Sequence, residues 1–268
     1  MLAVRQIDPR SRTDRHRFLR FPFTLYRNHP LWVPPIRPDA ELQLNRDKHP
    51  FYEHSDAGFF VAERDGKVVG RIAALENRPY NAYHQACTAR FYLFECTDDR
   101  EVASALFERV FEWARARGLN KVIGPKGFGP LDGYGILVEG FEHRPAMTMM
   151  NYNVHGDDIV GFLFGFPDVS AALQRCGGNV YSWRIVDLLL EFRRTKWTAI
   201  NGAGVLPEFQ GRGGNALLYV EMERAVHSSR FEHADLTQVA ESAVQMRQDL
   251  VNLGARPYKN HRVYYRNL

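Results

Sequence analysis

The sequence has no long apolar run: none of its hydrophobic stretches approaches the roughly 20 residues that a bilayer-spanning helix needs. Charge appears as early as Arg5, too soon for the apolar core of a secretory signal peptide. The three cysteines form no Cys-x-x-Cys pair, and their odd number argues against a disulfide framework. These absences predict a reduced, cytoplasmic protein.

Several catalytic signatures are absent as well. The ten histidines are scattered, with no His-Glu-x-x-His motif and no Cys/His pair at zinc spacing, so no metal site is predicted. No Gly-x-Ser-x-Gly motif marks a serine hydrolase. The glycine cluster at 124–135 lacks the Gly-Lys-Ser/Thr of a P-loop, which leaves a turn-rich loop or part of a substrate groove as its alternatives.

Composition is that of a folded protein. Of the 268 residues, 45% are hydrophobic and 25% charged, enough for one large domain or two ordinary ones. The formal charge is +4, with basic residues concentrated near the start, where Phe18, Leu19 and Phe21 are interleaved with them. This mixture favours a packed segment with a solvated basic face over a nucleic-acid reader, and an anionic ligand also suits the positive charge.

The first half alternates between strand and helix patterns. Two apolar runs flank Asp65-Gly66, which predicts a β-hairpin. A strand is expected over 89–94, followed by a helix over 99–117 with a single apolar stripe. Gly118 ends that helix, and 121–123 reads as the next strand.

A similar order follows in the second half. Strands are expected within 156–164 and 198–201, then a glycine loop, a helix, a strand over 233–239 and a helix over 242–252. A terminal hairpin is expected over 255–265.

The segment 205–218 carries most of the chemical information. An apolar strand ends before Pro207, a basic glycine loop follows, and an amphipathic helix begins at once. Such a loop presents backbone N–H groups and the positive end of a helix to one small volume, which suits a phosphate. The simpler interpretation is a glycine-rich turn that precedes a helix.

The loop resembles the acyl-CoA pyrophosphate loop of the GNAT (general N-acetyltransferase) superfamily, whose pattern is Gln/Arg-x-x-Gly-x-Gly/Ala. Gln210 and Gly213 match this pattern, whereas Asn215 departs from it. The resemblance implies acetyl-CoA or another acyl-CoA as co-substrate. Its predicted contacts are Val205, Leu206, Gln210, Gly211, Arg212, Gly213, Gly214, Asn215 and Ala216.

The repeated order of elements over 56–268 resembles a tandem GNAT protein. This implies an α/β (α+β layered) fold of two GNAT-like units, each a mixed twisted sheet flanked by helices. The predicted limits are 1–153 and 154–268. Residues 96–101 of the first unit have no glycine and three carboxylates, so that phosphate loop is degenerate. The second unit starts without the strand and two helices that usually form one wall of the acceptor groove, which suggests that a segment is missing at the 153/154 junction. The alternative is that the N-terminal region supplies this wall.

The resemblance implies acyl transfer from acyl-CoA to the amine of a small-molecule or amino-acid-like acceptor. In the family a tyrosine often acts as the general acid at the position that is Leu250 here, and leucine cannot donate a proton. The catalytic candidates are therefore Asn201 beside the expected thioester, Glu241 as base, and Tyr258 as acid.

Two other functions stay open. A non-catalytic GNAT-fold binding protein would explain Leu250 and Asn215. A tandem-GNAT aminoacyl or peptidyl transferase would use an RNA-linked donor, for which the arginine-rich start is the only support. No membrane partner is expected, and nucleic acid is disfavoured as a partner.

Overall fold

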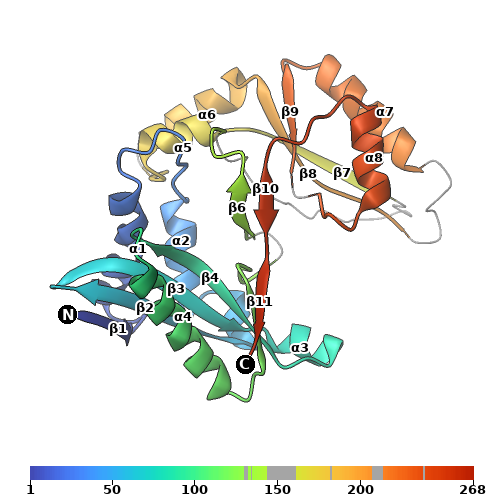
Figure 1. The fold of residues 1–268 in the computed structure, drawn as a ribbon. Helices are drawn as coiled ribbons and strands as arrows, with labels where there is room; N and C mark the ends of the chain where they lie inside the picture. The colour runs from blue at the N-terminus through green and yellow to red at the C-terminus, as the bar shows by residue number, and fades with distance from the viewer. Residues whose placement is uncertain (130–131, 134, 144–160, 182, 207–213, 238) are drawn as a thin grey trace. The chain divides into compact units, whose positions relative to one another are not determined.

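The structure is a computed structural model, and it describes the chain except for residues 130–131, 134, 144–160, 182, 207–213 and 238 (Figure 1). The chain divides into two compact units. Unit 1 is Met1–His143 with Tyr258–Leu268, and unit 2 is Arg144–Pro257. The predicted junction at 153/154 lies outside the described residues, so the limits 1–153 and 154–268 stay predictions.

Unit 1 is built on a six-stranded mixed sheet. The strand order is β1-β2-β3-β4-β5-β11. All neighbours are antiparallel except β4 and β5, which are parallel. The bounds of these strands are β1 (Leu2–Gln6), β2 (Asp56–Arg64), β3 (Lys67–Glu76), β4 (Thr88–Cys96), β5 (Lys121–Gly124) and β11 (Tyr264–Asn267).

The predicted hairpin around Asp65-Gly66 is present between β2 and β3. Asp65 has φ 52° and Gly66 has φ 76°, so both central residues adopt the left-handed conformation. A two-residue turn of this kind matches the right-handed twist of the strands that it joins, which is why Asp-Gly predicts it.

Helices cover both faces of this sheet. Neighbouring residues of a strand point to opposite faces, and Phe59 and Phe60 of β2 lie in two different core clusters. Phe60 packs with α4, whereas Phe59 packs with Phe18 of α1 and Leu44 of α2. The helical segments of unit 1 are α1 (Arg12–Leu25), α2 (Arg37–Leu44), the 3-10 helix η1 (Pro50–Glu53), α3 (Arg78–His84) and α4 (Arg100–Arg115).

The basic N-terminal segment is a packed part of unit 1, as its apolar residues predicted. Phe18 is fully buried. Arg5 forms ion pairs with Asp14 and Glu63, and Arg17 also pairs with Glu63. These arginines therefore neutralise carboxylates of their own unit.

Unit 2 contains a three-stranded sheet with the order β7-β8-β9. The central strand β8 is antiparallel to β7 and parallel to β9. Its elements are β7 (Gly161–Pro167), α5 (Ser170–Cys176), α6 (Arg184–Arg194), β8 (Trp197–Val205), α7 (Gly214–His227), β9 (His233–Leu236) and α8 (Val244–Asn252).

The terminal hairpin expected over 255–265 is wrong. The last two strands do not pair with each other: β10 (Asn260–Arg262) pairs with β6 (Ile136–Glu139), and β11 pairs with β5. The C-terminal residues thus belong to unit 1, where β11 satisfies the backbone groups along the edge of β5. Apolar alternation predicts a strand, but it does not identify the partner of that strand.

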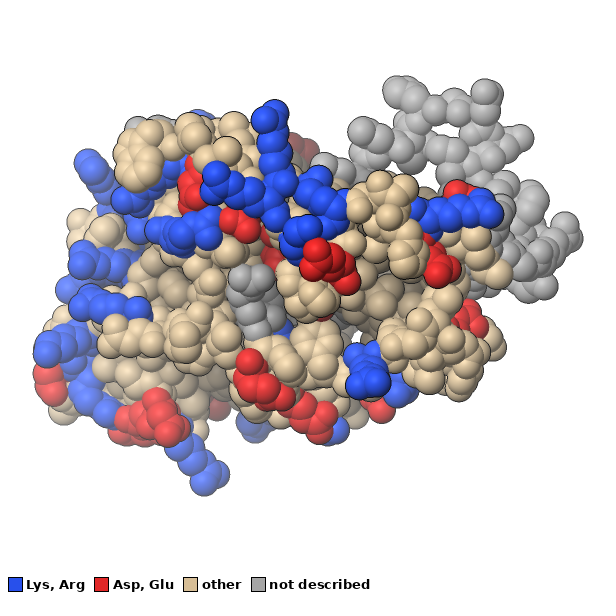
Figure 2. Space-filling model, turned by 90° about the horizontal axis from the view of Figure 1, so that it is seen from above, with Lys and Arg blue, Asp and Glu red and all other residues tan. Residues whose placement is uncertain are grey.

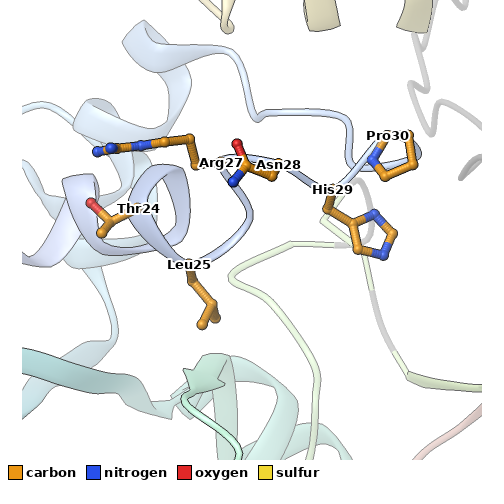
Figure 3. A pocket seen from close by; sticks show the side chains of 6 residues that line it. All are labelled: Thr24, Leu25, Arg27, Asn28, His29 and Pro30. Carbon is orange, nitrogen blue, oxygen red and sulfur yellow. The ribbon is translucent and has the colours of Figure 1, made fainter.

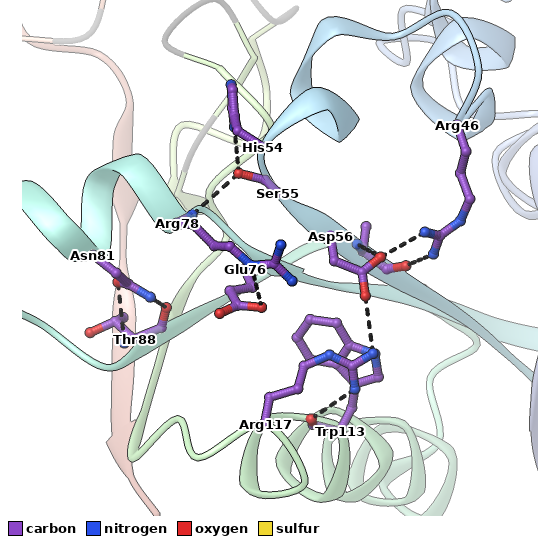
Figure 4. A network of polar contacts seen from close by, with 11 residues as sticks. Arg46, His54, Ser55, Asp56, Glu76, Arg78, Asn81, Thr88, Trp113 and Arg117 are labelled. Atoms are coloured by element: carbon purple, nitrogen blue, oxygen red, sulfur yellow. Dashed lines mark hydrogen bonds and ion pairs between the residues drawn. The ribbon is translucent and has the colours of Figure 1, made fainter.

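A charged network joins the start of β2 to the elements around it (Figure 4). The carboxylate of Asp56 accepts hydrogen bonds from Arg46 Nη1 at 2.6 Å and from Arg117 Nη2 at 3.0 Å. The Arg117 guanidinium also lies 3.9 Å from the centre of the Trp113 ring. Burial alone would raise the pKa of Asp56, but the hydrogen bonds from Arg46 and Arg117 outweigh it and hold the pKa below its ordinary value.

We expect Asp56→Asn to destabilise unit 1 in a pH-dependent way. Because the folded-state pKa lies below the ordinary 3.8, the stabilisation is present above that pH and is lost as pH falls through the folded value. Urea unfolding from pH 7 to pH 3 should show a difference between wild type and variant that shrinks at the acidic end. Arg46→Gln, which leaves Arg117 in place, should cause a smaller loss at neutral pH. A difference that stays constant across the range would contradict this assignment.

Candidate functional site

In both units a pair of parallel strands separates part of the way along. Among the described residues, β4 pairs with β5 through Thr88–Arg90, and β8 pairs with β9 through Trp197–Ile200. The longer strand of each pair continues beyond its partner, to Cys96 in unit 1 and to Val205 in unit 2. One edge of each longer strand is therefore not paired by the neighbouring parallel strand at its carboxyl end.

A β-bulge lies where each pair separates. In β8, Ile200 is opposite Gly165 and Ala203 is opposite Leu163, so Asn201 and Gly202 face one residue of β7. β4 has the same arrangement: two residues between Tyr92 and Glu95 face one residue of β3. Such a bulge bends its strand and increases the local twist. The bulge thus follows the last residue that pairs with the parallel partner in each unit.

A backbone with positive φ accompanies each bulge. Gly202 has φ 108°, which glycine adopts without strain, whereas unit 1 places Leu93 at φ 50°. The two units therefore share one scaffold, in which a bulged strand leads through a loop to the start of a helix. That helix is α4 in unit 1 and α7 in unit 2.

The start of α4 is occupied by a carboxylate of its own chain. Asp99 accepts hydrogen bonds from the backbone N–H groups of Glu101 at 2.9 Å and Val102 at 3.4 Å. Arg64 donates to Asp99 at 2.6 Å and to Glu101 at 2.5 Å. The Arg64 hydrogen bond is the main reason that the pKa of Asp99 lies below its ordinary value. The N–H groups that a phosphate would need are thus already used, and the local charge repels an anion.

The sequence-predicted loop of unit 2 lies largely outside the described residues. This applies to Gln210, Gly211, Arg212 and Gly213. Val205 is the half-buried last residue of β8, and Leu206 follows it at the surface. Gly214, Asn215 and Ala216 form the first turn of α7, so the predicted contacts flank the start of that helix.

The three catalytic candidates do not all lie in one unit. Asn201 is buried in the bulge of β8, and Glu241 is exposed in the turn before α8. Tyr258 belongs to unit 1, where its ring packs edge-on against His143 with the ring centres 4.9 Å apart. The structure places Asn201 and Glu241 in unit 2 and Tyr258 in unit 1.

Two further side chains of unit 2 bear on proton transfer. Leu250 is buried in α8, where it can only contribute packing. Tyr219 of α7 is also buried, and burial raises its pKa, so the hydroxyl keeps its proton at neutral pH. The sequence analysis did not single out Tyr219. The feature that could have identified it is a tyrosine near the start of the helix that follows the glycine loop.

Unit 1 has an open surface pocket of about 520 Å³ where α1 ends (Figure 3). Its side chains point in several directions rather than into one space, and they include no acidic residue. The pocket is lined by Thr24, Leu25, Arg27, Asn28, His29 and Pro30. This surface lacks the converging polar groups of a catalytic site.

Two searches of the described residues gave no site of another class. No three His, Cys, Asp or Glu side chains lie together in a way that would hold a metal ion. No described helix combines the length and the apolar character needed to cross a bilayer.

Comparison with known proteins gives a family match for part of the chain and a fold match for the whole chain. Residues 24–124 match the profile described as the acetyltransferase (GNAT) family. Along its whole length the chain is similar in fold to a tandem GNAT protein from the clavulanic acid biosynthesis pathway, with a TM-score of 0.50, 13% identity, and coverage of 100% of this chain and 98% of that chain. The family profile thus matches part of unit 1, and the whole chain has the fold of a tandem GNAT protein.

Two curated relatives share more sequence with part of the chain. Protein YghO of Escherichia coli (strain K12) is 30% identical over 139 residues, which is 52% of this chain and 35% of the relative. A bacterial ceramide synthase of Caulobacter vibrioides is 30% identical over 138 residues, 51% of this chain and 36% of the relative. The matched part therefore spans about a third of the length of each relative.

The role of Asp99 as the cap of α4 can be tested directly. We expect Asp99→Ala to lower the thermal unfolding midpoint, because two backbone N–H groups and Arg64 lose their acceptor. Asp98→Ala is the matched control, since Asp98 is exposed and precedes the cap. Equal midpoints for the two variants would contradict the assigned role.

Proposed function

We propose that this chain is an acyl-CoA-dependent N-acyltransferase whose second unit holds the acyl-CoA. The observation that carries the proposal is the separation of β8 from β9 at the Asn201–Gly202 bulge, followed by the start of α7. The acyl thioester would lie in the opening between the strands. The pyrophosphate would lie against the N–H groups of the loop 210–213 and the first turn of α7.

Unit 1 supports this choice by contrast. It has the same separated strands and bulge, but Asp99 occupies the start of its helix. The segment that matches the family profile, 24–124, thus lies in the unit whose phosphate position is closed. We assign this unit a structural role and the acyl-CoA to unit 2.

The proposed reaction is direct transfer. The acceptor nitrogen attacks the thioester carbonyl, a C–N bond forms, the C–S bond breaks, and the thiolate leaves with a proton from an acid. Glu241 would take a proton from the ammonium group of the acceptor, which frees the amine lone pair for attack, and Tyr258 would supply the proton to the thiolate. Backbone N–H groups at the end of β8 would polarise the carbonyl. At Gly204 a Cβ would lie 2.8 Å from Phe162 Cε1, so glycine at this position accommodates the Phe162 ring.

Asn201 would orient the acyl group beside the bulge. It is buried on β8, at the residue where the parallel pairing with β9 has just ended. A buried side-chain amide at this place offers both a donor and an acceptor to a carbonyl group or an amine.

The proposed acceptor is the amine of a small or amino-acid-like molecule. One relative is named a bacterial ceramide synthase, and a ceramide is an amide of a long-chain amine. Long-chain amines therefore belong in the same acceptor screen, alongside acetyl-CoA and longer acyl-CoA donors.

A non-catalytic binding protein is the second candidate. This candidate is favoured by Leu250, which is buried at the position where the family often has a tyrosine that acts as general acid. The RNA-linked aminoacyl transferase has lost part of its support, because Arg5 and Arg17 of the basic start already pair with carboxylates. Binding of acyl-CoA without turnover would favour the non-catalytic candidate.

We expect Gly213→Glu to abolish acyl-CoA binding, because its carboxylate would repel the pyrophosphate. Acetyl-CoA at about 100 times its dissociation constant should stabilise the wild type by roughly 2.7 kcal/mol, visible as a thermal shift. Arg100→Glu puts the same charge at the start of α4 and serves as the matched control. Acetyl-CoA should still cause the thermal shift in Arg100→Glu. If Arg100→Glu loses the shift and Gly213→Glu keeps it, acyl-CoA would be assigned to unit 1.

The proposed catalytic groups predict separate kinetic effects. We expect Glu241→Gln and Tyr258→Phe each to lower kcat by about 100-fold or more while acyl-CoA still binds, since each removes a proton-transfer group. Asn201→Ala should lower kcat/KM. Glu223→Gln, an exposed change on α7, is the control and should keep full activity. Wild-type kcat in both Glu241→Gln and Tyr258→Phe would rule out these roles and direct attention to Tyr219.

A further inference from the structure

The two acidic side chains of helix α6 in unit 2 face the neighbouring helix α5, and most of its apolar side chains are exposed. Its 11 residues, Arg184–Arg194, include no buried residue. The usual surface helix has the opposite arrangement, with an apolar stripe on the core and charges in solvent. This inversion needs a physical reason.

The inward side is held by ion pairs with α5. Arg175 of α5 donates to both carboxylate oxygens of Asp187, at 2.9 and 3.0 Å, and to Glu191 at 2.5 Å. The guanidinium of Arg184 donates to the backbone oxygen of Cys176 at 3.1 Å. The hydrogen bonds from Arg175 also lower the pKa of Asp187. Both acidic residues of α6 are thus engaged with α5.

The outward side is apolar and basic. Leu189 is 56% exposed and Val186 53% exposed, and Trp183 immediately before the helix is 73% exposed. Arg193 and Arg194 are exposed on the last turn. The exposed large apolar residues of this face are Trp183, Ile185, Val186, Leu189, Leu190 and Phe192.

The helix has no counterpart in unit 1. There α3 ends at His84 and β4 begins at Thr88, whereas in unit 2 the corresponding α5 ends at Cys176 and β8 begins at Trp197. α6 fills this longer connection. The shared scaffold of separated strands, bulge and following helix exists in unit 1 without such a helix, so the scaffold does not require it.

We propose that the outward face of α6 docks onto the surface of an anionic lipid bilayer. The charges beside this face favour an anionic partner, because its arginines are exposed while both acidic residues of the helix pair with Arg175. Apolar residues would enter the boundary between headgroups and acyl chains, and the arginines would meet lipid phosphates. With the face docked, Trp183 would lie at the membrane interface, where the amphipathic ring of tryptophan is favoured.

A second copy of this chain fits the face less well. A two-fold contact would bring the same face of both copies together and so gather Arg193 and Arg194 of each copy at one contact. Like charges close to an apolar contact disfavour such a dimer. Figure 2 shows Lys and Arg side chains, with Asp and Glu side chains among them, beside uncharged areas on the face that it draws.

The proposal does not depend on acyl-CoA or on turnover, and its test uses neither. The full chain is mixed with phosphatidylcholine vesicles, with and without phosphatidylglycerol, and the bound fraction is measured by sedimentation. We expect binding to the anionic vesicles that weakens as salt rises, accompanied by a blue shift of tryptophan fluorescence that Trp183→Phe removes.

Two variants test whether the outward face of α6, rather than another part of unit 2, binds the vesicles. Leu189→Glu should lower the partition coefficient roughly tenfold or more, because an exposed apolar anchor is lost and a like-signed charge faces the lipid. Val244→Glu is the matched control, an exposed apolar residue of α8, and should bind as the wild type does. Both variants change exposed residues, and circular dichroism checks that each is folded.

Three results would overturn the proposal. They are no binding to anionic vesicles, equal binding by Leu189→Glu and Val244→Glu, and a wild-type dimer in sedimentation that Leu189→Glu converts to monomer. The last would assign the face to a second copy.

Discussion

The separation of two parallel strands at a β-bulge is the constraint on which the rest of the structure depends. A continuous parallel ladder would use every backbone group along β8, and nothing could lie against its carboxyl end. The extra residue at Asn201–Gly202 bends the strand where β9 ends. In our proposal, the backbone groups left unpaired by β9 at the carboxyl end of β8 receive the thioester.

The same device occurs twice, and the two copies have diverged at the helix start. In unit 1 the carboxylate of Asp99 takes the N–H groups at the start of α4, held in turn by Arg64. In unit 2 the corresponding segment has the glycine-rich sequence 210–214. One copy thus uses its helix start for stability, while the other offers it to a ligand in our proposal. Duplication allows this division because the scaffold persists when one site closes.

Sequence reasoning predicted local features well and long-range partners poorly. The Asp65-Gly66 turn and the apolar stripe of α4 are determined by nearby residues, and the structure confirms both. The pairing of β11 with β5 was missed, because alternation marks a strand but not its neighbour. Helix α6 was not predicted at all, and its contact with α5 depends on the ion pairs of Arg175, which the order of residues along the chain does not reveal. For the site, Asn201 lies at the bulge, whereas Tyr258 lies in unit 1, a placement that chain order does not reveal.

The assignment of acyl-CoA to unit 2 is the central claim, and hydrogen–deuterium exchange with and without CoA tests it most directly. Bound CoA should slow exchange at the carboxyl end of β8, in the loop 207–213 and in the first turn of α7. The corresponding part of unit 1, from the end of β4 into α4, should exchange at the same rate in both samples. Slowed exchange in unit 1 with none in unit 2 would contradict the account.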